Sequence, residues 1–391
     1  MRIAYVTETF PPEINGVALT AQRTVRHLRA AGHAVQLIRP RQAGEAACRT
    51  ADEWRCGGGP IPMYPELRYG WTTPAALRAL WQAEGGLPDL VHVATPGPLG
   101  WAALRAAQAE GLPASADFRT NFHAYCGHYG LGWLEPVVLG SLRRLHSLAG
   151  LNFAPTPELA AQLARHGFER LQVLGRGVDA RQFRPDRRDP ELRRDWRAGP
   201  DQRVLLYVGR LAPEKNAGLA LQTFERLSAR RPGLRMVVVG DGPMRARLER
   251  AHPRALFVGM QTGSALARHY ASADLFLFPS LTETFGNVTL EALASGLAVA
   301  AFDTGAAAQH VRDGVSGCLA APAAGLDGAA AFLDAATRAL DASAPDGLLR
   351  LEARLAATQA DWDSVLRRFE LHLQQLAEAG RNPLPHYAAM A

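Results

Sequence analysis

Short apolar runs alternate with segments of helical periodicity along almost the whole 391-residue chain. In the segment GVALTAQRTVRHLRAAGH, for example, the apolar residues Val17, Ala21 and Val25 recur at the spacing of one buried helix face. This alternation is typical of a mostly parallel sheet that is covered by helices. The candidate strands of the first half are RIAYVTETF, AVQLIRP, DLVHVATP, ASADFRTN, LNFAPT and LQVLGRG.

The same pattern starts again after a charged stretch that runs from Asp179 to Gln202. The restart predicts an α/β protein with two doubly wound domains, joined near residues 176–186, with the first domain at 1–175 and the second at 186–364. Ligands of such sheets bind at the carboxyl ends of the strands, so we expect the site in a cleft between two facing sheets. The candidate strands of the second half are RVLLYVGR, LRMVVVGDG, ALFVGM, DLFLFPS, LAVAAFD and GCLAAP.

Composition limits the partners and the setting. The net charge of +6 and the pI of about 9.4 favour an anionic partner. Arginine is spread along the chain, and neither zinc-finger spacing nor an RNA-binding aromatic motif is present, so we expect no nucleic acid and retain anionic lipid or an anionic small substrate. The four cysteines form no CxxC pair, and no apolar run suits a signal peptide or a membrane span. We therefore expect a cytoplasmic protein.

The segment LTETFGNVTLEALASG places two carboxylates around a predicted helix start. Glu283 follows a candidate strand, Asn287 is a suitable N-cap, and Glu291 lies near the first helical turn. Gly286 lets the backbone approach a ligand closely, and the amides of Asn287 and Val288 at a positive helix end suit an anion. The segment therefore offers a phosphate site with a carboxylate on either side for hydroxyl groups. The alternative is a solvated Glu283 and a Glu291 that only complements the helix dipole.

The segment VGRLAPEKN holds the chain's single lysine. Arg210 and Lys215 follow the candidate strand VLLYV, and Asn216 is a candidate cap for the next helix. Two cations before a helix start suit a diphosphate, because arginine supplies a planar fork and lysine a compact, mobile charge. A solvated basic loop is the alternative.

Together these segments resemble a retaining GT-B glycosyltransferase of glycosyltransferase family 4, and the resemblance covers nearly the whole chain. It rests on the spacing of Glu283 and Glu291, on Arg210 and Lys215 upstream, and on Trp362 before the last helix. The resemblance implies two Rossmann-like domains that face each other across a cleft, with a C-terminal helix (about 365–391) that packs back on the first domain. The other matching segments are PPEINGVA, GRGVDARQFRP, VVVGDGP, FVG and ADLFLFPS.

The resemblance also implies roles for these residues. Arg210 and Lys215 match positions that hold the donor diphosphate. Glu283 matches a glutamate that contacts hydroxyls of the donor sugar, and Glu291 matches one that binds the ribose. Gly16 lies in the glycine loop that approaches the donor phosphate and the acceptor.

Two further regions carry implied roles. Gly259 and Met260 match the region next to the nucleobase. Many relatives carry a histidine before Thr-Asn-Phe, whereas this chain has Arg119 there and His123 four residues later. Both are candidates to contact the sugar or the leaving phosphate, and Arg119 would add positive charge beside a departing diphosphate. Further candidates for acceptor contact are Asn121 and Tyr125.

The implied reaction moves a hexosyl group from a nucleoside diphosphate sugar to an acceptor hydroxyl with retained anomeric configuration. It requires no metal and no cofactor besides the donor substrate, and the DWD string at Asp361 is expected to cap a helix. The segments PIPMYPELRYGW and DFRTNFHAY resemble relatives that mannosylate or glucosylate lipid or lipid-linked acceptors. We therefore expect GDP-mannose as donor, a lipid or lipid-linked acceptor, and peripheral contact with the inner face of the cell membrane.

Other activities stay open at this point. A UDP-glucose or other UDP-sugar transferase with a glycan or small-molecule acceptor is the first alternative, and a non-enzymatic glycan- or lipid-binding scaffold is the second. An NAD-type oxidoreductase is disfavoured, because Arg245 occupies the place of the third glycine in VVVGDGPMRARL. A phosphorylase needs a lysine for pyridoxal phosphate, and the single lysine lies in the diphosphate motif.

Overall fold

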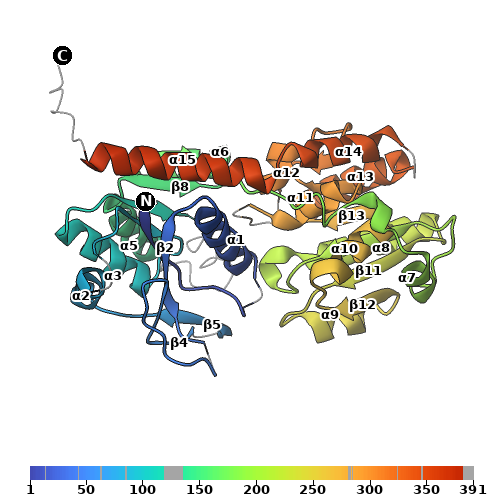
Figure 1. Cartoon of the computed structure of the whole chain (residues 1–391). Helices are drawn as coiled ribbons and strands as arrows, with labels where there is room; N and C mark the ends of the chain where they lie inside the picture. The colour runs from blue at the N-terminus through green and yellow to red at the C-terminus, as the bar shows by residue number, and fades with distance from the viewer. Residues whose placement is uncertain are drawn as a thin grey trace, which may run out of the picture. The chain divides into compact units, whose positions relative to one another are not determined.

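The computed structural model describes residues 1–13, 15–42, 44–61, 64–83, 86–118, 135–280, 283, 285–323, 325–344 and 347–381. These residues form two compact units, drawn in Figure 1. The described residues up to 175, together with 366–381, belong to unit 1, and those within 176–365 belong to unit 2.

Unit 1 is built on a seven-stranded parallel sheet in the order β3-β2-β1-β6-β7-β8-β9. The chain builds outward from β1 in one direction and then returns to add β6 on the other side, so β1 and β6 flank the switch point of the sheet. The strands are β1 (Arg2–Val6), β2 (Ala34–Pro40), β3 (Glu53–Cys56), β6 (Leu90–Val93), β7 (Ala114–Asp117), β8 (Leu151–Ala154) and β9 (Leu171–Val173). The helices are α1 (Gly16–Ala30), α2 (Pro74–Ala83), α3 (Pro98–Ala109), α5 (Glu135–Ser147), α6 (Pro157–Arg165) and α15 (Trp362–Arg381).

Helices cover both faces of this sheet, and β1 shows why. Ile3 and Tyr5 pack with α1 and α15, whereas Ala4 and Val6 pack with α2 and α3. Both faces of β1 are therefore buried, which explains its continuous apolar sequence. The helix α15 begins in unit 2, and from Leu366 onward it belongs to unit 1, where Phe369 packs in the same core cluster as Ile3.

Unit 2 repeats the arrangement with a six-stranded parallel sheet in the order β12-β11-β10-β13-β14-β15. Its switch point lies between β10 and β13. The strands are β10 (Val204–Val208), β11 (Arg235–Val239), β12 (Ala255–Gly259), β13 (Leu275–Phe278), β14 (Ala298–Phe302) and β15 (Cys318–Ala320). The helices are α7 (Pro190–Asp195), α8 (Ala217–Arg230), α9 (Arg245–Ala251), α10 (Gly263–Ser272), α11 (Asn287–Ala294), α12 (Gly305–His310), α13 (Gly325–Ala342) and α14 (Leu348–Thr358), and 3-10 turns lie at η2 (Pro185–Arg187) and η3 (Pro213–Lys215).

The two segments of unit 2 that lead to unit 1 are hydrogen-bonded to each other. The amide of Val178 donates to the carbonyl of Ala360 at 2.9 Å, and Val178 bridges to Asp361. A Cβ at Gly177 would lie 2.5 Å from the nitrogen of Trp362, so this close approach requires glycine. Backbone packing therefore explains the second glycine of the GRGVD motif.

Each of the twelve candidate strand segments contains a strand, and the predicted C-terminal helix is present as α15. The sequence did not predict β3 or the antiparallel hairpin of β4 (Gly58–Ile61) and β5 (Tyr64–Gly70). Its glycine-rich start, CGGGP, shows neither strand nor helix periodicity.

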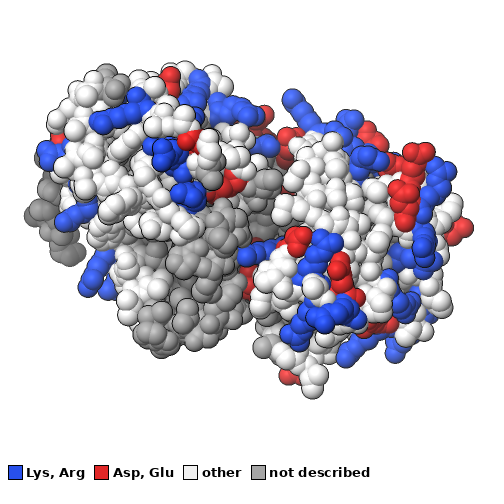
Figure 2. Space-filling model, turned by 90° about the horizontal axis from the view of Figure 1, so that it is seen from below, with Lys and Arg blue, Asp and Glu red and all other residues white. Residues whose placement is uncertain are grey.

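The charges on the face drawn in Figure 2 are mixed, with Lys and Arg side chains interspersed among Asp and Glu. No helix within the described ranges is both long enough and apolar enough to cross a membrane.

Candidate active site

Most of the predicted donor-binding residues lie at the carboxyl edge of the unit 2 sheet, in loops or at helix starts that follow its strands. Arg210 and Lys215 follow β10, Met260 follows β12 with Gly259 at its last position, and Glu283 follows β13. The remaining predicted residues on this edge are Gly286, Asn287, Val288 and Glu291, at the start of α11. Ligands of parallel sheets bind at this edge, so the sheet brings residues from three loops to one functional surface.

An ion pair joins two of these loops at the switch point. The Nζ atom of Lys215 lies 2.5 Å from Oε1 of Glu283, and the two side chains are only 17% and 11% exposed. Since β10 and β13 are neighbours, the loops that follow them meet although 68 residues separate the two side chains. The pair therefore holds one ammonium and one carboxylate, largely shielded from water, at the place where this fold binds ligands.

The loop after β10 is anchored by a buried tyrosine. The hydroxyl of Tyr207 is shared between the carbonyls of Arg210, at 3.2 Å, and Lys215, at 3.4 Å. Burial raises the pKa of Tyr207, and the nearby charges of Glu283 and Glu214 raise it further. The phenol therefore stays protonated and keeps donating to the loop that carries both cations.

The VVVGDGP motif shapes the same loop from the neighbouring strand. A Cβ at Gly240 would lie 2.0 Å from the carbonyl oxygen of Gly209, and a Cβ at Gly242 would lie 2.5 Å from that of Leu211. Both glycines have positive φ, of 136° and 154°. The motif thus lets the loop after β11 pack against the loop before Lys215, and this packing explains it without a dinucleotide.

Of the two predicted helix caps, Asn287 was wrong, whereas Asn216 has the predicted position without the capping hydrogen bond. At the start of α11 the N-cap position is Gly286, with φ of 96°, and Asn287 is the first helical residue. Asn216 does stand at the N-cap of α8, but its φ of 52° is left-handed and its side chain makes no capping hydrogen bond within the described residues. A side-chain cap requires an extended backbone, which neither position has.

The position of Asn287 as the first helical residue, and not as the N-cap, has a consequence for the site. Its side-chain oxygen is buried without a hydrogen-bond partner among the residues the structure describes. By helix geometry the first backbone amides of α11 also lack partners within the helix. The start of α11 therefore presents backbone donors and adds an acceptor that the sequence did not indicate, and anion binding there stays a prediction.

Glu291 is held by a buried phenol. The hydroxyl of Tyr270 donates to Oε2 of Glu291 at 3.0 Å. Burial raises the pKa of Tyr270 well above its ordinary value, and the charge of Glu291 raises it further, so the phenol remains a donor. The carboxylate is thereby fixed in orientation on the second turn of α11.

A pocket beside Glu283 adds a polar group that the sequence did not indicate. The hydroxyl of Ser280 is buried and lacks a partner in the described part of the chain. The residues lining the pocket are Phe278, Ser280, Glu283, Phe285, Thr289, Ala301, Phe302, Thr304 and Ala307.

In unit 1, the predicted glycine loop is held by a polar network. Oδ1 of Asn15 accepts from the amides of Val17 and Ala18, at 3.0 and 2.8 Å, and so caps α1, whose first residue is Gly16. Nδ2 of Asn15 donates to the hydroxyl of Thr9 at 2.8 Å, and that hydroxyl donates to Glu13. Gly16 is therefore positioned by side chains of its own loop.

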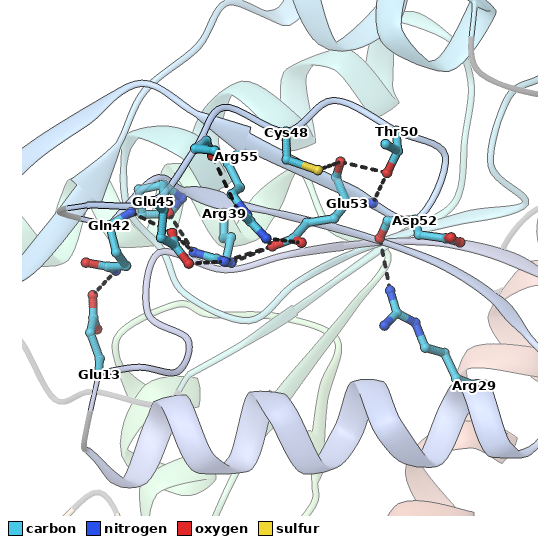
Figure 3. Close-up of polar contacts among 12 residues, drawn as sticks. Glu13, Arg29, Arg39, Gln42, Glu45, Cys48, Thr50, Asp52, Glu53 and Arg55 are labelled. Atoms are coloured by element: carbon cyan, nitrogen blue, oxygen red, sulfur yellow. Dashed lines mark hydrogen bonds and ion pairs between the residues drawn. The ribbon is translucent and has the colours of Figure 1, made fainter.

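Figure 3 shows how this network continues into the segment after β2. Nε2 of Gln42 donates to Oε1 of Glu13 at 2.5 Å, and the Gln42 amide donates to Glu45 at 2.8 Å. Arg39, which is 4% exposed, binds both oxygens of Glu45 at 2.7 Å and pairs with Glu53 at 2.8 Å. The hydrogen bond from Arg39 lowers the pKa of Glu45 to about 2, so these pairs persist at any physiological pH.

The switch point of unit 1 holds a buried carboxyl group that the sequence analysis missed. Glu8 follows β1 and is 8% exposed; its amide donates to the hydroxyl of Thr95 at 2.7 Å, after β6. Its Oε1 accepts from the amide of Leu99 at 2.9 Å, in the first turn of α3. Burial raises the pKa of Glu8 to about 8, and the Leu99 bond lowers it only in part. A charged residue two positions after an apolar strand was the available signal.

Some predicted residues cannot be placed. Arg119 and His123, with Asn121 and Tyr125, lie outside the described residues. Within the described ranges, no group of three or more His, Cys, Asp or Glu side chains could hold a metal ion. Asp361 caps α15, since its Oδ1 accepts from the amide of Ser364 at 2.8 Å, and the capping interpretation of the DWD string is confirmed.

Family models match both halves of the chain. Residues 14–182 match Glycosyltransferase Family 4, and residues 202–342 match Glycosyl transferases group 1. A GDP-mannose-dependent alpha-mannosyltransferase of Mycolicibacterium smegmatis is 39% identical over 344 residues, which are 86% of this chain and 88% of the relative. An alpha-monoglucosyldiacylglycerol synthase of Streptococcus pneumoniae is 26% identical over 318 residues, 77% of this chain and 71% of the relative.

The fold has solved counterparts. The sucrose-phosphate synthase of Thermosynechococcus elongatus matches with a TM-score of 0.78 at 19% identity, over 97% of this chain and 100% of that one. This likeness supports the predicted GT-B class, with its two Rossmann-like sheets. The family matches and the mannosyltransferase relative show that this chain belongs to glycosyltransferase family 4 and is a glycosyltransferase.

Proposed function

We propose that this glycosyltransferase is a retaining, metal-independent mannosyltransferase that moves mannose from GDP-mannose to a hydroxyl of a lipid or lipid-linked acceptor. The observation that carries the proposal is the shielded pair of Lys215 and Glu283 at the switch point of unit 2. The mannosyltransferase relative supports the choice of donor. The diacylglycerol-linked product in the name of the Streptococcus pneumoniae relative supports a lipid-type acceptor.

The residues of unit 2 suit a reaction that is driven by charge stabilisation. As the bond from sugar to phosphate breaks, negative charge develops on the leaving diphosphate. Lys215, Arg210 and the amides at the start of α11 supply positive charge and donors on the same edge of the sheet. Glu283 pairs with Lys215 and is placed to accept from sugar hydroxyls, which would orient the donor. Protein groups alone thus offer the charge that a metal ion would otherwise supply.

For the remaining predicted residues we propose the roles that the family resemblance implies. Glu291, oriented by Tyr270, is proposed to bind the ribose, and Gly259 with Met260 is proposed to border the nucleobase. Gly16, fixed by the Asn15 cap, is proposed to approach the phosphate and the acceptor.

The donor is tested by thermal shift of the full chain with GDP-mannose and with UDP-glucose. A donor at 100 times its Kd stabilises the folded state by about 2.7 kcal/mol, so we expect a clear rise of the melting temperature with GDP-mannose. A rise with UDP-glucose alone would refute the mannosyl assignment in favour of a UDP-sugar transferase.

Two further measurements test the mechanism. We expect activity to survive treatment with EDTA, and a loss that Mn²⁺ restores would contradict the metal-independent mechanism. We expect NMR of the product to show the same anomeric configuration as in the donor, and an inverted linkage would refute retention.

A further inference from the structure

The hairpin β4–β5 of unit 1 has no role in the site described above. Figure 1 shows it at the end of the unit, next to β2. Gly58 pairs with Gly70, and Gly59 pairs with Tyr69. The amide of Trp71 donates to the carbonyl of Gly57 at 3.0 Å, so the pairing continues one residue beyond β5. The hairpin is therefore regular where its two ends join the unit.

One face of the hairpin packs on the body of unit 1. A Cβ at Gly58 would lie 3.1 Å from Cβ of Pro40, and a Cβ at Gly70 would lie 3.0 Å from Cδ2 of Leu99. Pro40 is the last residue of β2, and Leu99 lies in the first turn of α3, which follows β6. The hairpin therefore rests on the carboxyl edge of the sheet, the edge at which doubly wound folds bind their ligands.

The opposite face carries two exposed aromatic rings. Tyr69 is 38% exposed and Trp71 is 70% exposed. Each lies across the glycine with which it pairs: a Cβ at Gly59 would lie 3.0 Å from the Tyr69 hydroxyl, and a Cβ at Gly57 would lie 3.4 Å from Nε1 of Trp71. Because residues two apart in a strand share a face and their backbone positions are about 7 Å apart, the two side chains leave the hairpin on the same side.

This arrangement suits a sugar ring. With glycine as its cross-strand neighbour, each aromatic ring lies close to that residue's backbone and keeps an exposed surface. A pyranose presents a face of C–H groups with partial positive charge, which packs well on the negative face of an aromatic ring. The Tyr69 hydroxyl and the Trp71 indole N–H add polar groups at the ring edges that can pair with sugar hydroxyls.

We propose that Tyr69 and Trp71 form an aromatic platform that stacks a sugar ring of the acceptor, so that the acceptor already carries a sugar. The inference rests on the proposed function, in which the donor is held by residues of unit 2. A sugar that stacks on the carboxyl edge of unit 1 is then part of the acceptor. The platform thus narrows the acceptor class from a bare lipid alcohol to a glycolipid or a glycan.

The first test measures sugar contact by saturation-transfer difference NMR of the full-length protein with methyl α-D-mannopyranoside and methyl β-D-glucopyranoside as probes. We expect the ring-proton signals of at least one probe to fall severalfold in Trp71→Ala and in Tyr69→Ala. The matched control is Trp101→Ala, which removes another exposed tryptophan of unit 1, 37% exposed on α3, and should keep the signals. Equal signals in all four proteins would overturn the proposal.

The second test measures transfer to octyl α-D-mannopyranoside, an acceptor that carries one sugar. Stacking holds the acceptor before and during reaction, so Trp71→Ala should raise its KM by about three- to tenfold with little change in kcat, and Trp71→Phe should restore much of the loss. A fall in kcat at unchanged KM would overturn the proposal. Wild-type protein that is not stabilised by GDP-mannose would instead refute the donor assignment, while the NMR test still decides the platform.

Tryptophan and tyrosine are also common at membrane surfaces. A third measurement therefore distinguishes sugar binding by Tyr69 and Trp71 from contact with lipid. Sedimentation with vesicles of phosphatidylcholine and phosphatidylglycerol compares the wild type with Trp71→Ala. Vesicle binding that is lost in Trp71→Ala while the NMR signals of the sugars persist would identify a lipid contact and overturn the proposal. Lost sugar signals with unchanged vesicle binding support it.

Discussion

The buried carboxyl group of Glu8 makes the stability of unit 1 depend on pH. The informative perturbation is Glu8→Gln, because the amide oxygen can still accept the hydrogen bond from Leu99 while the ionisable proton is removed. The side chain is 8% exposed, so the variant replaces a buried ionisable group by a neutral one of nearly equal size.

The direction of the pH effect on stability follows from the protonation of Glu8 in the folded and the unfolded state. Burial raises the pKa of Glu8 from 4.5 to about 8 in the folded protein. Between these values the folded state keeps a proton that the unfolded state has lost, so stability falls as the pH rises through that window. Each pH unit within it costs about 1.4 kcal/mol, so the total is on the order of 5 kcal/mol above pH 8. Glu8→Gln carries no such cost.

The assay compares melting temperatures of wild type and Glu8→Gln between pH 5 and pH 8.5. At roughly 2–4 °C for each kcal/mol, the variant should gain on the order of 10 °C relative to wild type across this range, in the transition of unit 1. Glu158→Gln, which replaces an exposed carboxylate on α6 of the same unit, is the control and should show no such gain. A difference between Glu8→Gln and wild type that stays constant with pH would refute the reasoning.

Two further predictions concern the ion pairs. Lys215→Arg should lower kcat/KM for GDP-mannose at least about tenfold, because a forked guanidinium cannot replace the compact ammonium beside Glu283. Lys215→Ala should lower kcat/KM by a factor of about 10²–10³. Near-normal steady-state kinetics of the arginine variant would contradict the role of the lysine. On α15, Glu370 binds His27 at 3.0 Å and His33 at 2.9 Å. Burial raises the pKa of Glu370, but the contacts with the two histidines outweigh burial and lower this pKa overall. The stabilisation from these contacts is therefore present above about pH 4.5 and is lost as the pH falls through the lowered pKa. Glu370→Gln should therefore lower stability by roughly 1–2 kcal/mol near pH 7 and by less near pH 3 in urea titrations, and an equal loss at both pH values would contradict this.

The strands were predictable because parallel strands with helices on both faces are buried throughout. β13, with the sequence LFLF, and β10, with VLLYV, are fully buried, and such continuous apolar runs between helical segments have few other interpretations. The hairpin that begins at Gly58 was missed because its first strand shows no such apolar run. Its glycines make close backbone contacts and leave no side chains from which a period could be recognised.

The positions of the site residues along the chain were predictable, but their local geometry was not. Lys215 and Glu283 each follow a predicted strand, which placed both at the carboxyl edge. Left-handed Gly286 takes the N-cap position that was predicted for Asn287, and Asn216 stands at its predicted position in a left-handed conformation that prevents the side-chain cap; residue type alone reveals neither conformation. The partner of Lys215 depends on strand order, since β10 and β13 are neighbours only through the crossover.

The two switch points of the molecule have the same topology, but one holds charged groups and the other holds uncharged ones. In unit 2, the loops after β10 and β13 meet through charged groups, Lys215 and Glu283. In unit 1, the loops after β1 and β6 meet through Glu8 and Thr95, and burial keeps Glu8 uncharged below about pH 8. A diphosphate needs cations and open helix ends, which the carboxyl edge of the unit 2 sheet has. A neutral hydroxyl acceptor gains nothing from such groups. The proposed division, with the donor on unit 2 and a sugar-bearing acceptor on unit 1, therefore follows from the ligand charge that each sheet edge can neutralise.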